Sequence, residues 1–282
     1  MIRVIFNQKG GVGKTSITCN LAAVTAQQAR KVVVIDLDTQ CNTSHYLSGH
    51  NAFEQTIADY LSQVGSVLFP SKNITHFVHE TPFKNLFLIP ASESLSSIEH
   101  SLESRYKIYK LRDGLMQLQE IYDDIYIDTP PAFNFFTKSA LIGAHRVLIP
   151  FDCDAFSRQS LDKVMTAIID ICEDHNPDLL IEGIIANQFQ PRAKLPLQLV
   201  NEMKEEGLNV LPIKLTNSVK MRESHQVSKP LIYLAPKHDL TLQFIQLYQM
   251  LNQSSHALNT QEQTSHELAA VIEKPPVADK EE

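Results

Sequence analysis

The 282-residue sequence contains no tryptophan and only four cysteines, Cys19, Cys41, Cys153 and Cys172, which are scattered along the chain. No pair of them has the spacing typical of a metal site, so a reduced intracellular protein is the simplest interpretation. No apolar run approaches the roughly 20 residues that a membrane-spanning helix needs. A buried strand is expected from Ile2 onward, which leaves no place for a signal peptide. These absences predict a cytoplasmic protein.

Positive charge is also scarce, because 25 Lys and Arg stand against 32 Asp and Glu, for a net charge of −7. This balance argues against nucleic-acid binding by the surface as a whole, but a local basic patch stays compatible with it. Residues 253–282 carry six acidic residues against two lysines and few large apolar side chains. We expect 253–282 to be a disordered acidic tail and 1–252 to form one domain.

The apolar pattern alternates short strand-like runs with longer helical stretches. Strands are predicted at 2–6, 31–36, 85–90, 124–128, 146–150 and 179–187. Helices are predicted at 15–29, 101–120, 135–143, 157–174, 195–206 and 238–251. The alternation predicts an α/β fold, with a mostly parallel twisted sheet and helices on both faces. Residues 41–84 have the least regular pattern and receive no assignment.

A glycine-rich turn, FNQKGGVGKTS at 6–16, follows the first predicted strand. A phosphate-binding loop reads Gly, four residues, Gly, Lys, then Ser or Thr, and GKT at 13–15 matches its end. The first position holds Gln8 instead of glycine, and a second lysine, Lys9, follows it. A strand, a Gly-rich turn and a helix N-terminus form a cradle of backbone N–H groups that binds phosphate. The alternative is a plain turn with a solvent-exposed lysine.

Each residue type in this loop suits one task. The glycines let the backbone approach a ligand and adopt positive φ. Lys14 is expected to reach the β- and γ-phosphates of ATP, and the Thr15 hydroxyl to ligate Mg²⁺. The loop residues predicted to hold the nucleotide are Gly10, Gly11, Val12, Gly13, Lys14 and Thr15.

Acidic residues follow two of the predicted strands. Asp36 and Asp38 lie in VVVIDLDTQCN, and Asp128 lies in DIYIDTPP. Ligands of open α/β sheets bind beyond the carboxyl ends of the strands, so the three carboxylates are expected to converge on the phosphates. Asp128 fits the residue that holds the Mg²⁺ shell, directly or through water. A single Asp at a strand end can instead be a turn former.

Three motifs, KGGVGKTS, DLDTQCN and IDTPP, resemble the ParA/MinD family of P-loop ATPases and, within it, the ParA branch. The likeness covers roughly residues 2–251. The branch usually has Pro and Gly where this chain has Thr39 and Cys41, which leaves the stiffness of that loop open. The resemblance implies a P-loop NTPase fold, ATP and Mg²⁺ as cofactors, and slow hydrolysis to ADP and phosphate.

The resemblance also implies roles for individual residues. Lys9 matches a signature lysine that reaches across a homodimer to the nucleotide of the other subunit, where a cation offsets transition-state charge. Lys9, Lys14 and Asp38 would be the catalytic residues, and Asp38 would position the attacking water. Asp36 would support these groups from outside the direct contacts to the metal ion and nucleotide. Ser16 would contact the α-phosphate. The alternative for Lys9 is a role confined to its own subunit, or simple solvation of the loop.

Asn187 ends the strand predicted at 179–187, about where family members place an adenine-contacting residue. An amide can pair with the N6/N7 edge of adenine. The competing interpretation is an asparagine that caps the end of the strand.

The resemblance further implies that ATP controls binding to a surface, which is double-stranded DNA for ParA-like members and a membrane for MinD-like ones. MinD-like proteins end in a basic amphipathic helix. The tail here is acidic, so no membrane binding is expected. Residues 192–237 carry eight Lys or Arg against four acids. Arg192 and Lys220 match the family's DNA-contacting positions, and Arg222 lies close by; these would be sequence-independent phosphate contacts.

Two questions about the basic segment 192–237 stay open. A solvated basic face is the alternative to a DNA-binding patch. His225 and Ser228 replace a Pro and a Gly of the family pattern in this segment, so its loop geometry is not given by the resemblance.

The predicted function is therefore a ParA-type switch ATPase, nucleoid-associated, that positions or partitions a plasmid, chromosome or protein complex. A ParB-like or other adaptor would stimulate it, and no N-terminal helix-turn-helix domain is expected. The alternatives are a MinD-like ATPase, a metabolic ligase or synthetase of the same fold, and a scaffold that has lost hydrolysis. An iron–sulfur electron donor is excluded, because DTPPAFNFF after the fourth predicted strand contains no cysteine.

Overall fold

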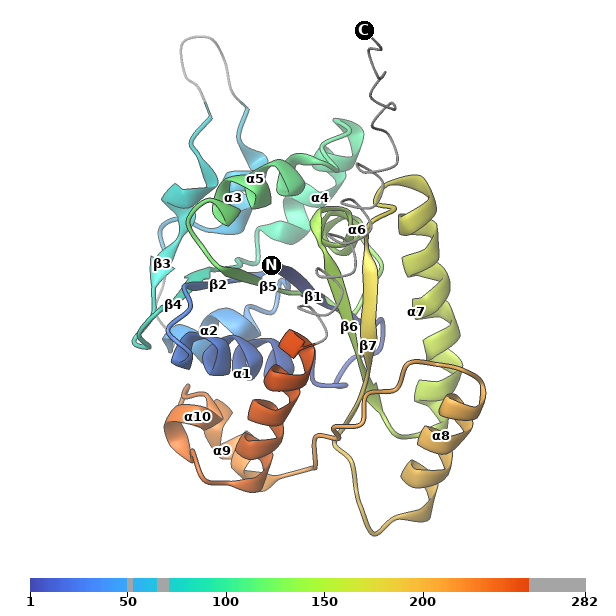
Figure 1. Ribbon diagram of the computed structural model, residues 1–282. Coiled ribbons are helices and arrows are strands. Elements are labelled where there is room, and N and C mark those ends of the chain that lie inside the picture. Colours follow the sequence, from blue (N-terminus) through green and yellow to red (C-terminus); the bar gives the residue numbers. More distant parts are fainter. Residues whose placement is uncertain (50–52, 65–70, 254–282) are drawn as a thin grey trace, which may run out of the picture.

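The computed structural model describes residues 1–49, 53–64 and 71–253 (Figure 1). Apart from Gln253, the predicted tail lies outside the described residues. Within them, no helix has the length and apolar character needed to cross a membrane.

Seven strands of the described chain form one sheet in the order β3-β4-β2-β5-β1-β6-β7. β3 runs antiparallel to β4, and every other neighbouring pair is parallel. The mostly parallel sheet predicted from the sequence is therefore confirmed. The strands are β1 (Ile2–Ile5), β2 (Val32–Asp36), β3 (His79–Glu80), β4 (Leu86–Ile89), β5 (Asp124–Asp128), β6 (Arg146–Asp152) and β7 (Leu180–Asn187).

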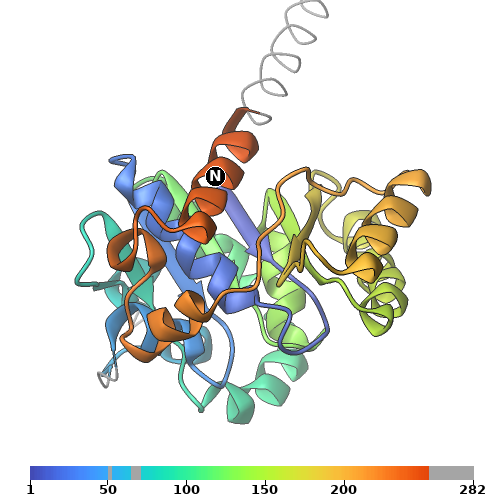
Figure 2. The ribbon, with the colours of Figure 1, turned by 90° about the horizontal axis from the view of Figure 1, so that it is seen from below.

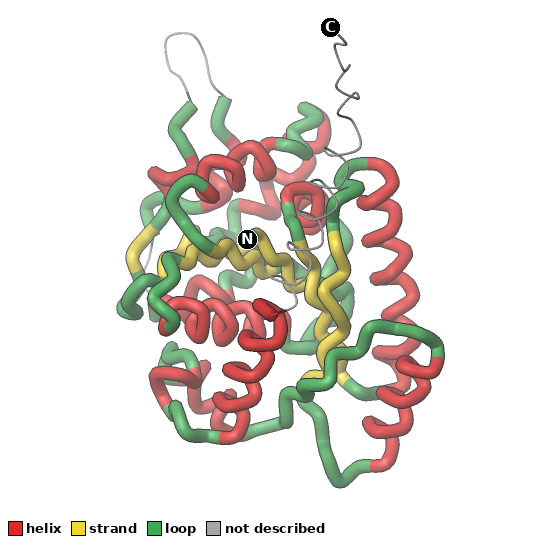
Figure 3. The backbone as a smooth tube through the Cα atoms, viewed as in Figure 1, coloured by secondary structure: helices red, strands yellow, loops and turns green. Residues whose placement is uncertain are grey.

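Helices cover both faces of this sheet, as predicted (Figures 1 and 3). Consecutive residues of β2 alternate between two hydrophobic cores, with Val33 and Ile35 in one and Val32 and Val34 in the other. Both faces are thus buried, which explains the continuous apolar runs of the central strands.

One core packs against α1 (Lys14–Gln27), α2 (Asn42–Ser48), α10 (Leu231–Leu234) and the helical residues 239–253, with α9 (Val219–Gln226) at its margin. The other packs against α3 (Ile57–Ser62), α4 (Leu95–Ser104), α5 (Lys110–Gln119), α6 (Phe135–Gly143), α7 (Ala155–Asp174) and α8 (Lys194–Glu205), and against the 3₁₀ helix η1 (Ile74–Phe77). Figure 2 shows α8 and α9 on well separated parts of the molecule.

One predicted helix is wrong. The stretch 101–120 contains the end of α4 and the whole of α5, and the chain between them leaves the helical path. Tyr106 there has a φ of 53° and is 89 % exposed. A left-handed residue cannot continue a right-handed helix. Apolar residues on both sides keep the helical spacing, so periodicity alone conceals the break.

The unassigned segment 41–84 contains α2, α3, η1 and β3 where it is described. The start of α3 has a local signal, because the Asp59 carboxylate accepts from the Thr56 backbone N–H and hydroxyl. This reciprocal cap uses a Thr and an acid three residues apart. Because the cap fixes the start of this six-residue helix, α3 forms without the long apolar repeat by which the other helices were predicted.

Candidate active site

The turn between β1 and α1 is held by a buried side chain. Asn7 Nδ2 donates to the Pro150 carbonyl at 2.7 Å, and Asn7 Oδ1 accepts from the Lys9 backbone N–H at 2.9 Å. Gly13 precedes α1 with a φ of 91°, and a Cβ there would lie 2.2 Å from Asn187 Nδ2. Glycine is therefore required at position 13 by both conformation and space. The first backbone N–H groups of α1 remain available for an anion.

The end of β7 is fastened to this loop. Asn187 Nδ2 donates to the Val12 carbonyl at 2.8 Å, and Gln188 Nε2 donates to the Gly11 carbonyl, also at 2.8 Å. Asn187 therefore clamps the loop rather than merely capping its own strand. Its contact with adenine stays a prediction, and the motif search did not single out Gln188.

Lys14 is a nearly buried cation at the start of α1, only 7 % exposed. Its Nζ donates to the Lys9 carbonyl at 3.2 Å, so the side chain lies back along the loop. Burial lowers the pKa of Lys14, and the nearby Asp128 and Asp38 carboxylates oppose that change. A desolvated ammonium group interacts more strongly with an arriving anion than one in water.

The sheet brings two carboxylates into register, because β2 pairs with β5 so that Asp36 lies opposite Asp128. Burial, and then repulsion from Asp128, raises the pKa of Asp36 to about 7. Burial raises the pKa of Asp128 to about 6, although hydroxyl groups that donate to it oppose the change. Two buried carboxylates at the end of adjacent strands are costly unless a cation or donors compensate them.

Both carboxylate oxygens of Asp36 accept hydrogen bonds from the protein itself. Its carboxylate accepts from the backbone N–H of Asp38 at 3.0 Å and from the backbone N–H and hydroxyl of Ser44 at 2.8 and 2.7 Å. Asp36 therefore organises the loop between β2 and α2. Asp38, 9 % exposed, starts that loop and accepts from the Gln40 backbone N–H at 3.0 Å.

The two carboxylate oxygens of Asp128 differ in their hydrogen bonds within the described residues. Its Oδ2 accepts from the hydroxyls of Thr15 at 2.6 Å and Thr43 at 2.7 Å. Its Oδ1 is buried and has no hydrogen-bond partner in the described part of the chain. An unpartnered buried carboxylate oxygen is expensive. Sequence reasoning missed Thr43, because only the packing of α2 against the strand ends brings it here.

Lys9 contacts acidic residues of its own chain. Its Nζ lies 2.5 Å from Oδ2 of Asp154, just beyond β6, and 3.8 Å from Oδ2 of Asp152, the last residue of β6. Burial raises the pKa of Asp152, and Lys9 opposes that change. The two acids were not identified from the sequence. The role of Lys9 across a dimer stays a prediction.

Two hollows border the start of α1. The first, about 320 Å³, is lined by Gly11, Gly13, Ser16, Asn187, Gln188, Thr216, Asn217, Ser218, Met221, Arg222, His225 and Leu240. The second, about 400 Å³, is lined by Thr15, Asn42, His45, Tyr46, His225 and Ser228. Ser16 and His225 share a hydrogen bond of 3.0 Å. The chain that precedes and forms α9 thus supplies much of the first wall, which the motifs did not show.

The residues predicted to bind DNA belong to two different segments of the chain. Arg192 follows β7 and precedes α8, whereas Lys220 and Arg222 belong to α9, and these helices are far apart in Figures 1 and 2. Lys220 pairs with Glu223 on its own helix. Arg222 is exposed but also lines the first hollow. DNA contact by these residues stays a prediction.

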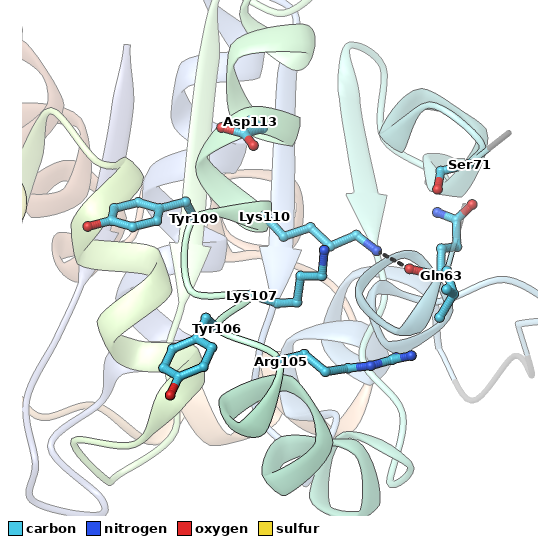
Figure 4. A pocket seen from close by; sticks show the side chains of 9 residues that line it. Gln63, Ser71, Arg105, Tyr106, Lys107, Tyr109, Lys110 and Asp113 are labelled. Atoms are coloured by element: carbon cyan, nitrogen blue, oxygen red, sulfur yellow. Dashed lines mark hydrogen bonds between the residues drawn. The ribbon is translucent and has the colours of Figure 1, made fainter. Parts of the chain in front are cut away.

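A third hollow, about 630 Å³, lies between the end of α3 and the chain joining α4 to α5 (Figure 4). Arg105, Lys107 and Lys110 extend into it side by side. Lys110 Nζ donates to the carbonyls of Leu61 at 3.0 Å and Gln63 at 2.8 Å. Burial, then repulsion from Lys107 and Arg105, lowers the pKa of Lys110 to about 8. This hollow lies on the other side of the sheet from α1, so it is separate from the candidate site.

A glycine-rich loop between a buried strand and a helix, with carboxylates at the ends of the adjacent strands β2 and β5, defines a P-loop nucleotide-binding protein. Residues 1–181 match the AAA domain family AAA_31. The chain is 33 % identical over 230 residues to the chromosome partitioning protein ParA of Myxococcus xanthus, covering 81 % of this chain and 79 % of that protein. It is 29 % identical over 239 residues to the sporulation initiation inhibitor protein Soj of Bacillus subtilis, covering 84 % and 92 %. The chain belongs to this AAA-domain family of P-loop ATPases, of the ParA/MinD type.

Solved structures share the fold at lower identity. Apo McdA of Cyanothece has a TM-score of 0.77 at 23 % identity, covering 88 % of this chain and 98 % of that one. Cobyrinic acid a,c-diamide synthase of Mycobacterium smegmatis, solved with an ATP analogue and magnesium, has a TM-score of 0.77 at 23 % identity, covering 89 % and 94 %. Proteins with different names thus share this architecture equally, so the fold alone does not select the function.

Proposed function

We propose that this chain is an ATP-dependent dimerising switch of the ParA type. Its ATP-bound dimer binds double-stranded DNA without sequence preference and positions or partitions a cargo. Hydrolysis is slow and is stimulated by a ParB-like or other adaptor. The observation that carries the nucleotide part is the unpartnered Asp128 Oδ1 beside the P-loop.

The residues present fit a magnesium–nucleotide complex. The Thr15 hydroxyl and the Asp128 carboxylate lie together at the loop, and one carboxylate oxygen has no partner in the described chain. Mg²⁺ prefers such oxygen ligands and is usually held by one or two protein groups together with phosphates. The bound ion neutralises charge on the phosphates. Thr15 and Asp128 would hold it, and Lys14 would reach the same phosphates.

The other two acidic residues, Asp36 and Asp38, position the loop after β2 and the attacking water. Asp36 is fully engaged by Asp38 and Ser44, so it orients the loop that presents Asp38. Asp38 then orients the attacking water by accepting a hydrogen bond from it. No covalent intermediate on the protein is needed.

The proposed dimer contact is made by Lys9, which in the single chain pairs with acids of its own subunit. Its ammonium group sits at the mouth of the loop against Asp154 and Asp152, and it is partly exposed. Binding to a partner's nucleotide requires exchange of these contacts for phosphate oxygens. Without such a cation, the two phosphate-bearing faces would repel each other. Because Lys9 would bind the partner through the phosphates of its ATP, dimerisation depends on ATP.

The test compares duplex binding and oligomeric state in ADP, ATP and a non-hydrolysable analogue. We expect a dimer and retention of random-sequence duplex DNA with ATP or the analogue, and neither with ADP. Binding should weaken steeply with salt, because phosphate contacts release counterions. A metabolic ligase of this fold would bind no DNA in any state, and a MinD-like protein would bind anionic vesicles instead.

A further inference from the structure

Helix α9 has contacts on one side and cations on another. Met221, Ser224 and His225, spaced to share one helix face, all contact side chains of α1 or α2. Lys220 and Arg222 alternate with them and belong to the segment proposed to contact DNA. Lys220 and Arg222 thus flank the contact face of the helix, and Arg222 also lines the hollow beside the nucleotide loop.

Two of the inner contacts are buried anchors. The hydroxyls of Ser224 and Tyr46 share a short hydrogen bond, and these residues are 0 % and 4 % exposed. Asn20 Nδ2 donates to the Tyr46 hydroxyl at 3.1 Å and to Met221 Sδ at 3.7 Å. Ser224 is fully buried, whereas Met221 and Tyr46 also line the hollows beside the loop. The buried Tyr46–Ser224 pair therefore joins α9 to α2 at the edge of the candidate site.

The third contact is different, because it is exposed. Ser16 Oγ and His225 Nε2 are 3.0 Å apart, and both residues line the 320 Å³ hollow beside the loop. His225 also lines the second hollow, so its ring stands where the two meet. Ser16 lies in the first turn of α1, where backbone N–H groups attract an anion.

We propose that His225 binds the nucleotide together with Ser16, by donating from its ring to the phosphate that meets the N-terminus of α1, and that this contact sets the orientation of α9. The proposal rests on the proposed function above. The His225 ring also packs edge-on against the Tyr46 ring, so a phosphate that draws this ring toward it reorients α9 about the buried Tyr46–Ser224 pair. Lys220 and Arg222 then take their DNA-binding placement only when the nucleotide is bound.

This contact distinguishes the chain from the family pattern. The pattern has a proline where His225 stands, and proline has no side-chain donor.

The first test is a double-mutant cycle on nucleotide affinity, with a fluorescent ADP or ATP titrated into the full chain. H225A should weaken binding about threefold to tenfold, the worth of one hydrogen bond. Because Ser16 and His225 act on one phosphate, the S16A/H225A double variant should lose less than the product of the single losses. H225Q, whose amide can donate, should recover most of the affinity, and Q226A on the exposed side should match the wild type. Wild-type affinity in H225A, or losses that simply multiply, would overturn the proposal.

The second test measures retention of random-sequence duplex with and without saturating ATP. The ratio of the two affinities should fall at least about threefold in H225A, because binding no longer orients α9. An unchanged ratio in H225A beside an ATP-dependent wild type would refute the coupling alone. A wild type without ATP-dependent retention would refute the proposed function instead, and the nucleotide titration would still decide whether His225 binds the nucleotide.

Discussion

The carboxyl ends of β2 and β5 and the outer side of α9 carry opposite charges in opposite environments. Asp36 and Asp128 are 0 % and 1 % exposed and are fixed by strand register and hydroxyl donors. Arg222 is exposed, and the partly exposed Lys220 pairs with Glu223 on its own helix. Buried charges must be placed accurately because desolvation makes errors expensive, whereas exposed cations are screened and adjustable. The first region suits nucleotide chemistry and the second suits contact with a phosphate backbone.

The largest effect is expected at the buried region. Lys14→Ala removes the desolvated cation that we propose reaches the phosphates, so ATP affinity should fall at least about 100-fold. Isothermal titration of the variant measures this loss, with circular dichroism as the folding control. Affinity within a few-fold of the wild type would contradict the P-loop assignment. Gln226→Ala is the matched surface control and should bind ATP normally.

Asp38→Ala tests whether the loop after β2 serves hydrolysis rather than binding. The Thr15 and Asp128 side chains remain, so ATP should bind while hydrolysis falls by about 100-fold or more. Sedimentation in ATP should show a trapped dimer that still retains DNA. A variant that is monomeric in ATP would count against this role for Asp38.

The exposed region should respond to charge reversal without loss of nucleotide binding. Arg192→Glu with Lys220→Glu should weaken duplex binding by at least about tenfold and flatten its salt dependence, since phosphate contacts are lost. Gel shifts over a salt series measure both quantities. Lys84→Glu with Lys163→Glu gives the same change of net charge at exposed residues elsewhere and should keep more of the affinity. Equal losses in the two double variants would refute the assignment of Arg192 and Lys220 as DNA-binding residues.

The smallest effect is a pH dependence of stability in the nucleotide-free chain. The pKa values of Asp36 and Asp128 are raised from 3.8 to about 7 and about 6, so the folded state binds more protons than the unfolded state between these limits. Stability contributed by these groups is therefore present below pH 4 and is lost as pH rises through about 7.

Asp36→Asn removes the group with the larger shift. Between pH 5 and 8 its melting temperature should decline less than that of the wild type, by about a few degrees. Differential scanning fluorimetry without nucleotide measures the slopes. Identical slopes in the two proteins would show that this carboxylate is already ionised in the folded chain.

Much of the candidate site was readable from local sequence. The loop at 6–16 needed only the order of strand, glycines, Lys and Thr, because one turn and one helix start build the phosphate cradle. The fold class followed from strands and helices that alternate with clear periods. The break at Tyr106 was hidden, because a left-handed residue leaves no mark on the apolar spacing.

The sequence by itself determined the phosphate loop, the parallel sheet and the acids that end β2 and β5, since each depends on neighbours in the chain or on a rule of sheet topology. Only the tertiary structure decided that Thr43 completes the surroundings of Asp128, that Asp154 holds Lys9, and that His225 meets Ser16. These partners lie 85, 145 and 209 residues apart. No local period records such pairings, because packing of whole helices onto the sheet creates them.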